Sequence, residues 1–324
     1  RRALLIGAGT TGEALLKVIT DIKPNPYIVE GVIDDDPAKH GKQIQGFKVL
    51  GGSELLAKLI PEKGISDLLV SISGRMNEDT FRELLNAQEA GLEITRMPVA
   101  YEEVLERVPV HFLEADWLLR SFVDETRINR FYELLKRLLD ILGGLVGVLI
   151  LTVMTPILAI AILLESGRPV FFSQTRAGKR GVPYTVIKFR TMRPDAEKPG
   201  EAILAKEDDD RSTRLGRIMR KTRLDEWPQF VNVLRGEMSL VGPRPERPEL
   251  MEHFEERIPF YRARLLAKPG ITGWAQVNFG YAATLEEMAI KLEYDLFYVK
   301  QQSIVLDFII LLRTLSTIFR LRGR

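Results

Sequence analysis

Two adjacent carboxylates, Asp225 and Glu226, lie in the stretch of the chain best suited to chemistry. This stretch, residues 221–245, begins with cationic side chains, passes through an amphipathic segment and ends in a proline-rich loop. A carboxylate that attacks phosphorus needs cations to neutralise the phosphate, and its oxygens, with those of the phosphate, suit a divalent ion such as Mg²⁺. The candidate cations are Lys188, Arg190, Arg220 and Arg244.

The same residues also fit a purely structural interpretation. The spacing from Thr222 to Asp225 matches a capping box, so Asp225 could simply begin a helix that ends before Gly236. Because Pro228 suits a first turn, we expect the helix to start near Asp225. Both acids would then lie at its positive end, where carboxylates stay ionised and a phosphate can bind. The local pattern leaves capping and catalysis open.

Length and charge indicate two domains with different surroundings. A chain of 324 residues can form two cores. Residues 1–124 hold 14 Lys and Arg against 20 Asp and Glu, whereas the remainder holds 32 against 24. The basic remainder suits anionic substrates or an anionic membrane surface.

Several classes of site are excluded by composition. The chain has no cysteine, which rules out disulfides, thiolate zinc sites and cysteine nucleophiles. Its three histidines show no metal-ligand spacing. No signal peptide is visible, and because the chain starts at Arg1 in a strand-like run, we expect it to be part of a longer protein.

Residues 1–124 alternate between short β-branched runs and helical patterns, which predicts an α/β, Rossmann-like domain with a mostly parallel sheet. We expect strands at 3–7, 28–35, 67–73 and 92–97, and helices near 11–22, 53–60 and 78–90. The length argues against a full six-stranded dinucleotide-binding sheet.

A glycine-rich turn follows the first expected strand. Gly7, Gly9 and Gly12 form a GxGxxG pattern before a helix, and Asp34 ends the second strand, where a ribose-binding acid is expected. The turn could hold a nucleotide or nucleotide sugar at the helix N-terminus. It could equally be a tight turn that binds nothing.

Residues 141–164 are 24 residues without a formal charge, long enough to cross a bilayer. Pro156 interrupts them, and cationic residues flank both ends: Arg130, Lys136 and Arg137 before, and Arg168, Arg176, Lys179 and Arg180 after. If both flanks remain on the cytoplasmic side, the segment enters the membrane and returns. We therefore expect a re-entrant helix–break–helix at 138–165, with a single span or a buried core helix as alternatives.

The remaining segments complete a mainly helical α+β domain. We expect a β-hairpin within 166–193, a loop at 268–278 and a helix at 285–299. Residues 304–319 are apolar and precede three arginines, which suits an interfacial helix, although a packed core helix is the alternative.

From about Lys136 onwards the chain resembles the bacterial sugar transferases, the monotopic polyprenyl-phosphate hexose-1-phosphate transferases. The resemblance covers nearly 190 residues, and its motifs occur in family order. They are the apolar helix with Thr155-Pro156, Lys188-Phe189-Arg190-Thr191-Met192, Leu224 to Gln229, Asn232 to Pro245, and Lys268 to Asn278. Residues 1–124 resemble the Rossmann-like domain of larger members, which carry transmembrane helices upstream.

The resemblance implies a two-step transfer on the cytoplasmic face of the bacterial inner membrane. Asp225 would attack a UDP-sugar and release UMP, and polyprenyl phosphate would then take the sugar phosphate from Asp225. Asp225 and Glu226 would hold Mg²⁺, while Lys188 and Arg220 steady phosphates. The substrate-binding residues would be Arg190, Pro243, Arg244, Pro245, Gln276 and Asn278. A homodimer is compatible with the family, and no nucleic-acid partner is expected.

The implied organisation is a Rossmann-like domain at 1–124, a basic connector at 125–137 and a catalytic domain at 138–324. One departure limits what can be transferred, because many relatives have Gly-Arg after Gln-Val-Asn, where this chain has Phe279-Gly280-Tyr281. That places it nearer an exopolysaccharide-associated branch and leaves the sugar open. Two alternatives are an inactive nucleotide-sensing membrane scaffold and, on the glycine turn alone, an NAD-dependent oxidoreductase.

Overall fold

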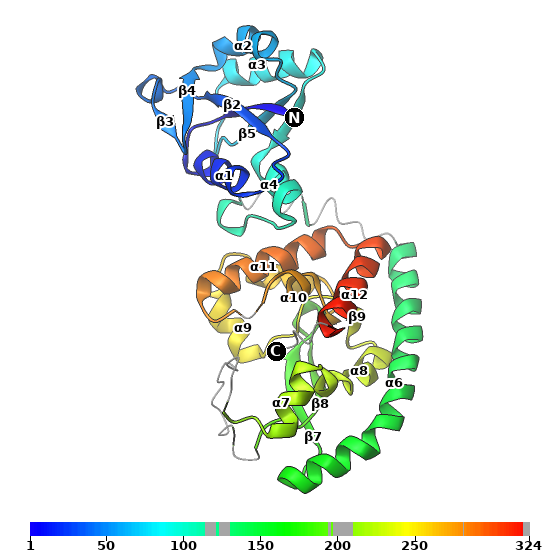
Figure 1. The fold of residues 1–324 in the computed structure, drawn as a ribbon. Helices are drawn as coiled ribbons and strands as arrows, with labels where there is room; N and C mark the ends of the chain where they lie inside the picture. The colour runs from blue at the N-terminus through cyan, green and yellow to red at the C-terminus, as the bar shows by residue number, and fades with distance from the viewer. Residues whose placement is uncertain (114–120, 123–129, 194–195, 197–209, 281, 320–324) are drawn as a thin grey trace. The chain divides into compact units, whose positions relative to one another are not determined.

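The computed structural model describes residues 1–113, 121–122, 130–193, 196, 210–280 and 282–319. They form two compact units, Arg1–Leu113 and Glu114–Arg324 (Figure 1). Residues 114–120 and 123–129, where the sequence places the end of the first domain and the start of the connector, lie outside the described residues.

The first unit is built on a six-stranded sheet in the order β3-β4-β2-β1-β5-β6. All neighbouring pairs are parallel except β3 with β4. The expected strands are present as β1 (Arg2–Ile6), β2 (Ile28–Ile33), β5 (Asp67–Val70) and β6 (Glu93–Arg96).

The expectation of fewer than six strands was wrong. The two additional strands, β3 (Gln43–Ile44) and β4 (Phe47–Gly51), are joined by Gln45 and Gly46, which both have positive φ. A tight two-residue turn of this kind lets a short hairpin fit between β2 and the next helix.

Helices cover both faces of this sheet, as Figure 1 shows for the blue and cyan part of the chain. On one face α1 (Thr10–Asp21) and α4 (Met97–Leu105) pack against alternate strand residues such as Leu5. On the other face α2 (Leu56–Lys63) and α3 (Glu78–Glu89) pack against the intervening residues. The fold is therefore the doubly wound, Rossmann-like arrangement predicted from the sequence.

The second unit begins with α6 (Arg130–Ser166), a 37-residue helix. It starts eight residues before the expected position, so residues 130–137 of the connector are helical. Within the described residues it is the one helix long and apolar enough to cross a membrane, and an 18-residue stretch of it has a mean hydropathy of 2.7. Many of its apolar side chains are exposed, including Leu149 and Val153.

Pro156 does not divide α6 into two helices. The helix continues through the proline, and Figure 1 shows it curving towards its C-terminal end. The Thr155 hydroxyl donates to the Leu151 carbonyl (2.7 Å), an i to i−4 bond of the kind that bends helices. The expected helix–break–helix is thus a single curved helix here, and its path relative to a membrane stays a prediction.

Three glycines let α6 lie close to the rest of the unit. A Cβ at Gly144 would lie 2.7 Å from Leu234 of α8 (Gln229–Arg235), and one at Gly143 would lie 2.5 Å from Leu240. A Cβ at Gly147 would overlap the Phe230 ring. The apolar helix is therefore part of the scaffold that carries α8.

A hairpin and a small parallel pair supply the strands of this unit. β7 (Phe171–Ala177) pairs antiparallel with β8 (Pro183–Phe189), which confirms the expected hairpin. β9 (Ser239–Val241) pairs with β10 (Gly270–Thr272), and α10 (Trp274–Asn278) follows, so residues 268–278 are not simply a loop.

The remaining helices are α7 (Arg214–Lys221), α9 (Pro248–Glu255), α11 (Leu285–Lys300) and α12 (Ile304–Phe319). A buried Asp307 fixes α12, because it accepts from Lys136 Nζ (2.7 Å) and from the Tyr298 hydroxyl (2.8 Å). Apolar residues such as Val305 and Phe308 remain exposed on α12. Its interfacial role stays a prediction.

We expect Gly147→Leu to lower the free energy of unfolding of this unit by about 1–3 kcal/mol, because the new side chain must push Phe230 and α8 away from α6. The thermal unfolding midpoint of the detergent-solubilised protein measures this. Val146→Leu, on the exposed face of the same helix, is the matched control and should leave the midpoint unchanged. Equal midpoints for both variants would contradict the close-packing role of Gly147.

Candidate active site

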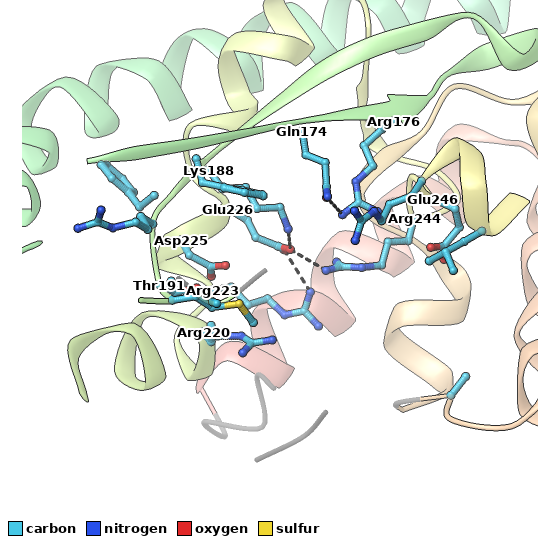
Figure 2. Close-up of a pocket in the computed structure, with 18 of the residues that line it drawn as sticks. Gln174, Arg176, Lys188, Thr191, Arg220, Arg223, Asp225, Glu226, Arg244 and Glu246 are labelled. Atoms are coloured by element: carbon cyan, nitrogen blue, oxygen red, sulfur yellow. Dashed lines mark hydrogen bonds and ion pairs between the residues drawn. The ribbon is translucent and has the colours of Figure 1, made fainter. Parts of the chain in front are cut away.

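The two carboxylates singled out from the sequence line a cavity of about 390 Å³ (Figure 2). Its walls come from β7, β8, the C-terminal end of α7, the turn that carries Asp225 and the loop after β9. This volume lies within the range of small-molecule sites.

The acidic turn is not the start of the expected helix. Thr222 ends α7, Arg223 has φ +56, and Leu224–Glu226 form a separate 3-10 turn before α8 begins at Gln229. Asp225 therefore caps nothing, and the capping-box interpretation was wrong. The left-handed conformation at Arg223 reverses the chain after α7 and directs both carboxylates into the cavity.

Glu226 is held by cations from three different segments. Its Oε1 accepts from Lys188 Nζ on β8 and from Arg244 Nη2 after β9, each at 2.9 Å, and Arg223 Nη1 lies 3.6 Å from Oε2. Burial opposes ionisation, but the charges of Arg244, Lys188 and Arg223 outweigh it and hold the pKa of Glu226 well below its usual range. Glu226 is thus a permanent anion that organises the site.

Asp225 has a contrasting environment. It is equally buried, yet its side chain accepts no hydrogen bond from the residues that the structure describes. Burial, and then the neighbouring charge of Glu226, raise the pKa of Asp225, while Lys188, Arg244 and Arg220 act in the opposite direction. A weakly solvated carboxylate without hydrogen-bond partners is well placed to act as a nucleophile.

The cavity as a whole is strongly cationic. Among the described residues that line it, nine are Lys or Arg and three are carboxylates. Cations buried at this density are favourable only when an anion joins them. The lining therefore suits a ligand with several negative charges.

Two other predicted cations also line the cavity. Arg220 donates to the Ser212 hydroxyl (2.8 Å) and contributes its charge to the surroundings of Asp225. Arg190 instead donates to the Ser166 carbonyl (2.9 Å) and to the Gly167 carbonyl, at the C-terminal end of α6. Its first role in this structure is to hold that helix end.

The other predicted substrate-binding residues lie apart from the carboxylates. Pro243 and Pro245 border a small hollow beside the main cavity. Gln276 Nε2 donates to the Ile271 carbonyl (3.1 Å), and Asn278 Nδ2 donates to the Trp274 carbonyl (3.0 Å). The structure therefore places Gln276 and Asn278 within α10 and its surroundings, where they support local structure.

A second polar group lines the cavity and was not selected from the sequence as part of a site. It comprises Gln174, Arg176, Glu246, Arg247 and Lys291, contributed by β7, the loop after β9 and α11. The alternation of Phe172, Gln174 and Arg176 along one strand was a usable signal, because such residues share a face. Nothing in the local sequence indicated Glu246 or Lys291, which are 45 residues apart.

The two carboxylates fit a magnesium ion that arrives with a phosphate ligand. Glu226 Oε2 is buried without a hydrogen-bond partner, and Asp225 has both oxygens available, so hard oxygen donors are present. No three His, Asp or Glu side chains gather into a ready-made metal site in the described part of the chain. Further ligands would thus have to come from substrate and water.

The glycine turn of the first unit has the predicted geometry. Gly7 has φ +107, and a Cβ at Gly12 would overlap the Gly7 carbonyl, while the space beside Gly9 is open. Asp34, however, accepts from the Ala8 amide (2.6 Å) and from Lys39 Nζ (3.0 Å). Its carboxylate stabilises the turn itself, and nucleotide binding there stays a prediction.

Comparison with known proteins shows that the second unit is similar to sugar transferases. The sequence model of the family described as "Bacterial sugar transferase" matches residues 131–321. The chain is 38% identical over 225 residues to a UDP-N-acetylgalactosamine-undecaprenyl-phosphate N-acetylgalactosaminephosphotransferase of Aeromonas hydrophila, covering 69% of this chain and 53% of that protein. It is 42% identical over 188 residues to a UDP-glucose:undecaprenyl-phosphate glucose-1-phosphate transferase of Caulobacter vibrioides, covering 57% of this chain and 70% of that protein.

The chain thus spans about half the length of the Aeromonas relative. Among solved structures, a UDP-D-quinovosamine 4-dehydrogenase from Vibrio fischeri matches 37% of this chain and 98% of its own, with 22% identity and a TM-score of 0.28.

We expect Glu246 to make the folded state sensitive to acid. Burial opposes its ionisation, but the charges of Lys291 and Arg264 prevail and lower the pKa of Glu246 to about 2. A lowered pKa stabilises the fold above the unfolded-state value and loses that contribution as the pH falls, by about 2 kcal/mol between about pH 5 and pH 3. Chemical denaturation at several pH values should show a shallower pH slope for Glu246→Gln. The exposed Glu249→Gln is the control, and an unchanged slope for Glu246→Gln would exclude this contribution.

Proposed function

The chain belongs to the bacterial sugar transferase family, and on that premise we propose that it transfers a sugar 1-phosphate from a UDP-sugar to undecaprenyl phosphate. Relatives with 38% and 42% identity are named for this type of transfer. The reaction would start the assembly of a polysaccharide on its lipid carrier.

The observation that carries the proposal is the difference between the two neighbouring carboxylates. Glu226 is engaged by Lys188 and Arg244, whereas Asp225 is buried, accepts no hydrogen bond from the described residues and faces a cationic cavity. A scaffold or a binding protein would gain nothing from a buried carboxylate beside an anion site. An enzyme that makes a covalent phosphoryl intermediate requires one.

In the first half-reaction, an Asp225 oxygen attacks the β-phosphorus of the UDP-sugar. The bond from this phosphorus to the bridging oxygen breaks, UMP leaves with the bonding electrons, and a sugar-phosphoryl aspartate remains. Lys188, Arg223 and Arg244 lie where they can neutralise the negative charge that spreads over the phosphoryl oxygens.

In the second half-reaction, a phosphate oxygen of undecaprenyl phosphate attacks the same phosphorus and the Asp225 carboxylate leaves. The acceptor oxygen is already ionised at neutral pH, so no general base has to remove a proton. Charge is conserved in both steps, and the enzyme returns to its starting state.

We propose that Asp225 and Glu226 hold Mg²⁺ together with the diphosphate. The ion would supply charge neutralisation at the phosphoryl oxygens. The residues of the chain position the substrate and exclude water around it.

The apolar helix α6 explains how a lipid substrate reaches this cavity. Its exposed apolar face suits hydrocarbon, while α8 and the acidic turn pack against its glycine face. With cationic residues at both ends, we propose that α6 enters the cytoplasmic leaflet of the inner membrane and returns. The cavity would then lie at the membrane surface, where a soluble nucleotide sugar and a lipid phosphate can meet.

We expect Asp225→Asn to abolish UMP release, because an amide cannot form the phosphoryl intermediate. The measurement incubates the solubilised protein with Mg²⁺, undecaprenyl phosphate and a panel of UDP-sugars, and follows UMP. Asp36→Asn, an exposed carboxylate in the first unit, is the control and should keep full activity. A folded Asp225→Asn enzyme that still turns over would remove Asp225 from the role of nucleophile.

We expect both ends of α6 to be accessible from the cytoplasmic side only. The chain has no cysteine, so Arg130→Cys and Ser173→Cys each give a single exposed thiol for impermeant labelling of oriented vesicles. Pro156→Leu should straighten the helix and move the second site to the opposite side. If the two cysteine variants that keep Pro156 are labelled from opposite sides of the vesicle membrane, α6 crosses the bilayer once.

A further inference from the structure

One face of β7 forms a row along the cavity wall. Phe172, Gln174 and Arg176 alternate along the strand and all line the cavity. Phe172 pairs with Lys188, which contacts Glu226, whereas Arg176 pairs with Tyr184 four pairs further along the hairpin. The strand therefore extends from the carboxylate pair to a second region of the same cavity.

Arg176 is a cation that lies near Glu246 without forming an ion pair with it. Its Nη2 donates to Gln174 Oε1 (2.7 Å) and its Nη1 lies 3.4 Å from the Pro245 carbonyl, and no ion pair joins it to the described residues. Burial lowers the pKa of Arg176; the charge of Glu246 opposes this shift, and the charges of Arg244 and Arg247 add to it. Partly buried cations held beside one another are stabilised when an anion binds between them.

The cavity has two ends. Figure 2 shows Asp225 and Arg220 on one side of the Glu226–Arg244 pair, and Gln174 and Arg176 on the other side. In an in-line displacement the entering and leaving atoms lie on opposite sides of the phosphorus. If Asp225 attacks a phosphorus atom beside Arg244, the leaving group therefore lies on the side away from Asp225. Figure 2 shows Arg176 on that side of the Glu226–Arg244 pair.

The chemistry of the proposed function, on which this inference rests, constrains what occupies that position. Both half-reactions are in-line displacements at the same phosphorus, and Asp225 enters in the first and leaves in the second. The group opposite Asp225 is the UMP phosphate in the first step and the undecaprenyl phosphate in the second. Two different substrates must therefore present a phosphate monoester at one place.

We infer that Gln174 and Arg176 form this shared phosphate-monoester subsite. In the first step the bonding electrons pass to the bridging oxygen as it becomes a terminal oxygen of UMP, and the guanidinium neutralises the negative charge that develops there. In the second it holds the acceptor phosphate so that one of its oxygens is directed at the phosphorus. The amide of Gln174 fixes the guanidinium and offers further hydrogen bonds to the same phosphate.

The test measures the two half-reactions separately in the Arg176→Gln variant. UMP release without lipid measures formation of the intermediate, and its discharge by added undecaprenyl phosphate, after UMP is removed, measures the second step. We expect both rates to fall about 10- to 100-fold, as for loss of a charge-assisted hydrogen bond. Hydrolysis of the intermediate by water should be unchanged because it needs no second phosphate. Arg176→Lys should restore part of both rates.

The matched control is Arg180→Gln, an exposed cation in the turn of the same hairpin, which should behave as the unmodified enzyme. An Arg176→Gln variant that slows only UMP release assigns the subsite to the nucleotide alone, and one that slows only the discharge assigns it to the lipid alone. Either of these results would overturn the shared subsite. So would unchanged rates of both half-reactions, or a rate of hydrolysis that falls together with them. If the unmodified enzyme forms no intermediate with any UDP-sugar, the proposed function itself fails.

Discussion

The buried charge of Glu226 is the constraint on which the site depends. Lys188 from the hairpin, Arg244 from the loop after β9 and Arg223 from the turn itself all compensate it. Removal of a partner from a buried ion pair leaves a charge without solvation, which costs several kcal/mol. Three segments that are distant in sequence are therefore held in one arrangement by electrostatic balance, and Asp225 takes its position from that arrangement.

The apolar helix α6 combines an exposed apolar face, which suits a membrane, with a role as structural support. Its leucines and valines remain exposed on one face, while Gly143, Gly144 and Gly147 let α8 approach on the other. Arg137 strengthens the contact by donating to the Val233 and Leu234 carbonyls (2.8 and 2.7 Å) at the end of α8, where helical carbonyls lack intrahelical partners or share one with the cap residue. The segment that follows the acidic turn is thereby attached to the apolar helix.

The elements with regular patterns could be predicted from the sequence, whereas the exact role of a residue often could not. The parallel strands, the hairpin and the long apolar helix all have periodicity or length as a local signal. Asp225 looked like a helix cap because Thr222 and Pro228 have the right spacing, and only the left-handed Arg223 shows that the turn is separate from α8. Glu246 and Lys291 meet through tertiary packing, for which no local signal exists.

Gln276 and Asn278 show that membership of a sequence motif does not by itself identify a substrate-binding residue. They were selected through a motif, yet each uses its side chain to satisfy a nearby backbone carbonyl. A motif marks residues that belong together, and it does not say whether they touch the substrate. Contacts, burial and charge are needed to separate the two cases.

Arg190 has a consequence for how the protein responds to its surroundings. It closes the C-terminal end of α6, and Lys188, two residues earlier, contacts Glu226. A short piece of extended chain thus connects the end of the apolar helix with the charge that organises the site. If α6 enters the membrane as proposed, bilayer thickness and lateral pressure would act on it directly, and the same connection would carry their effect to the cavity.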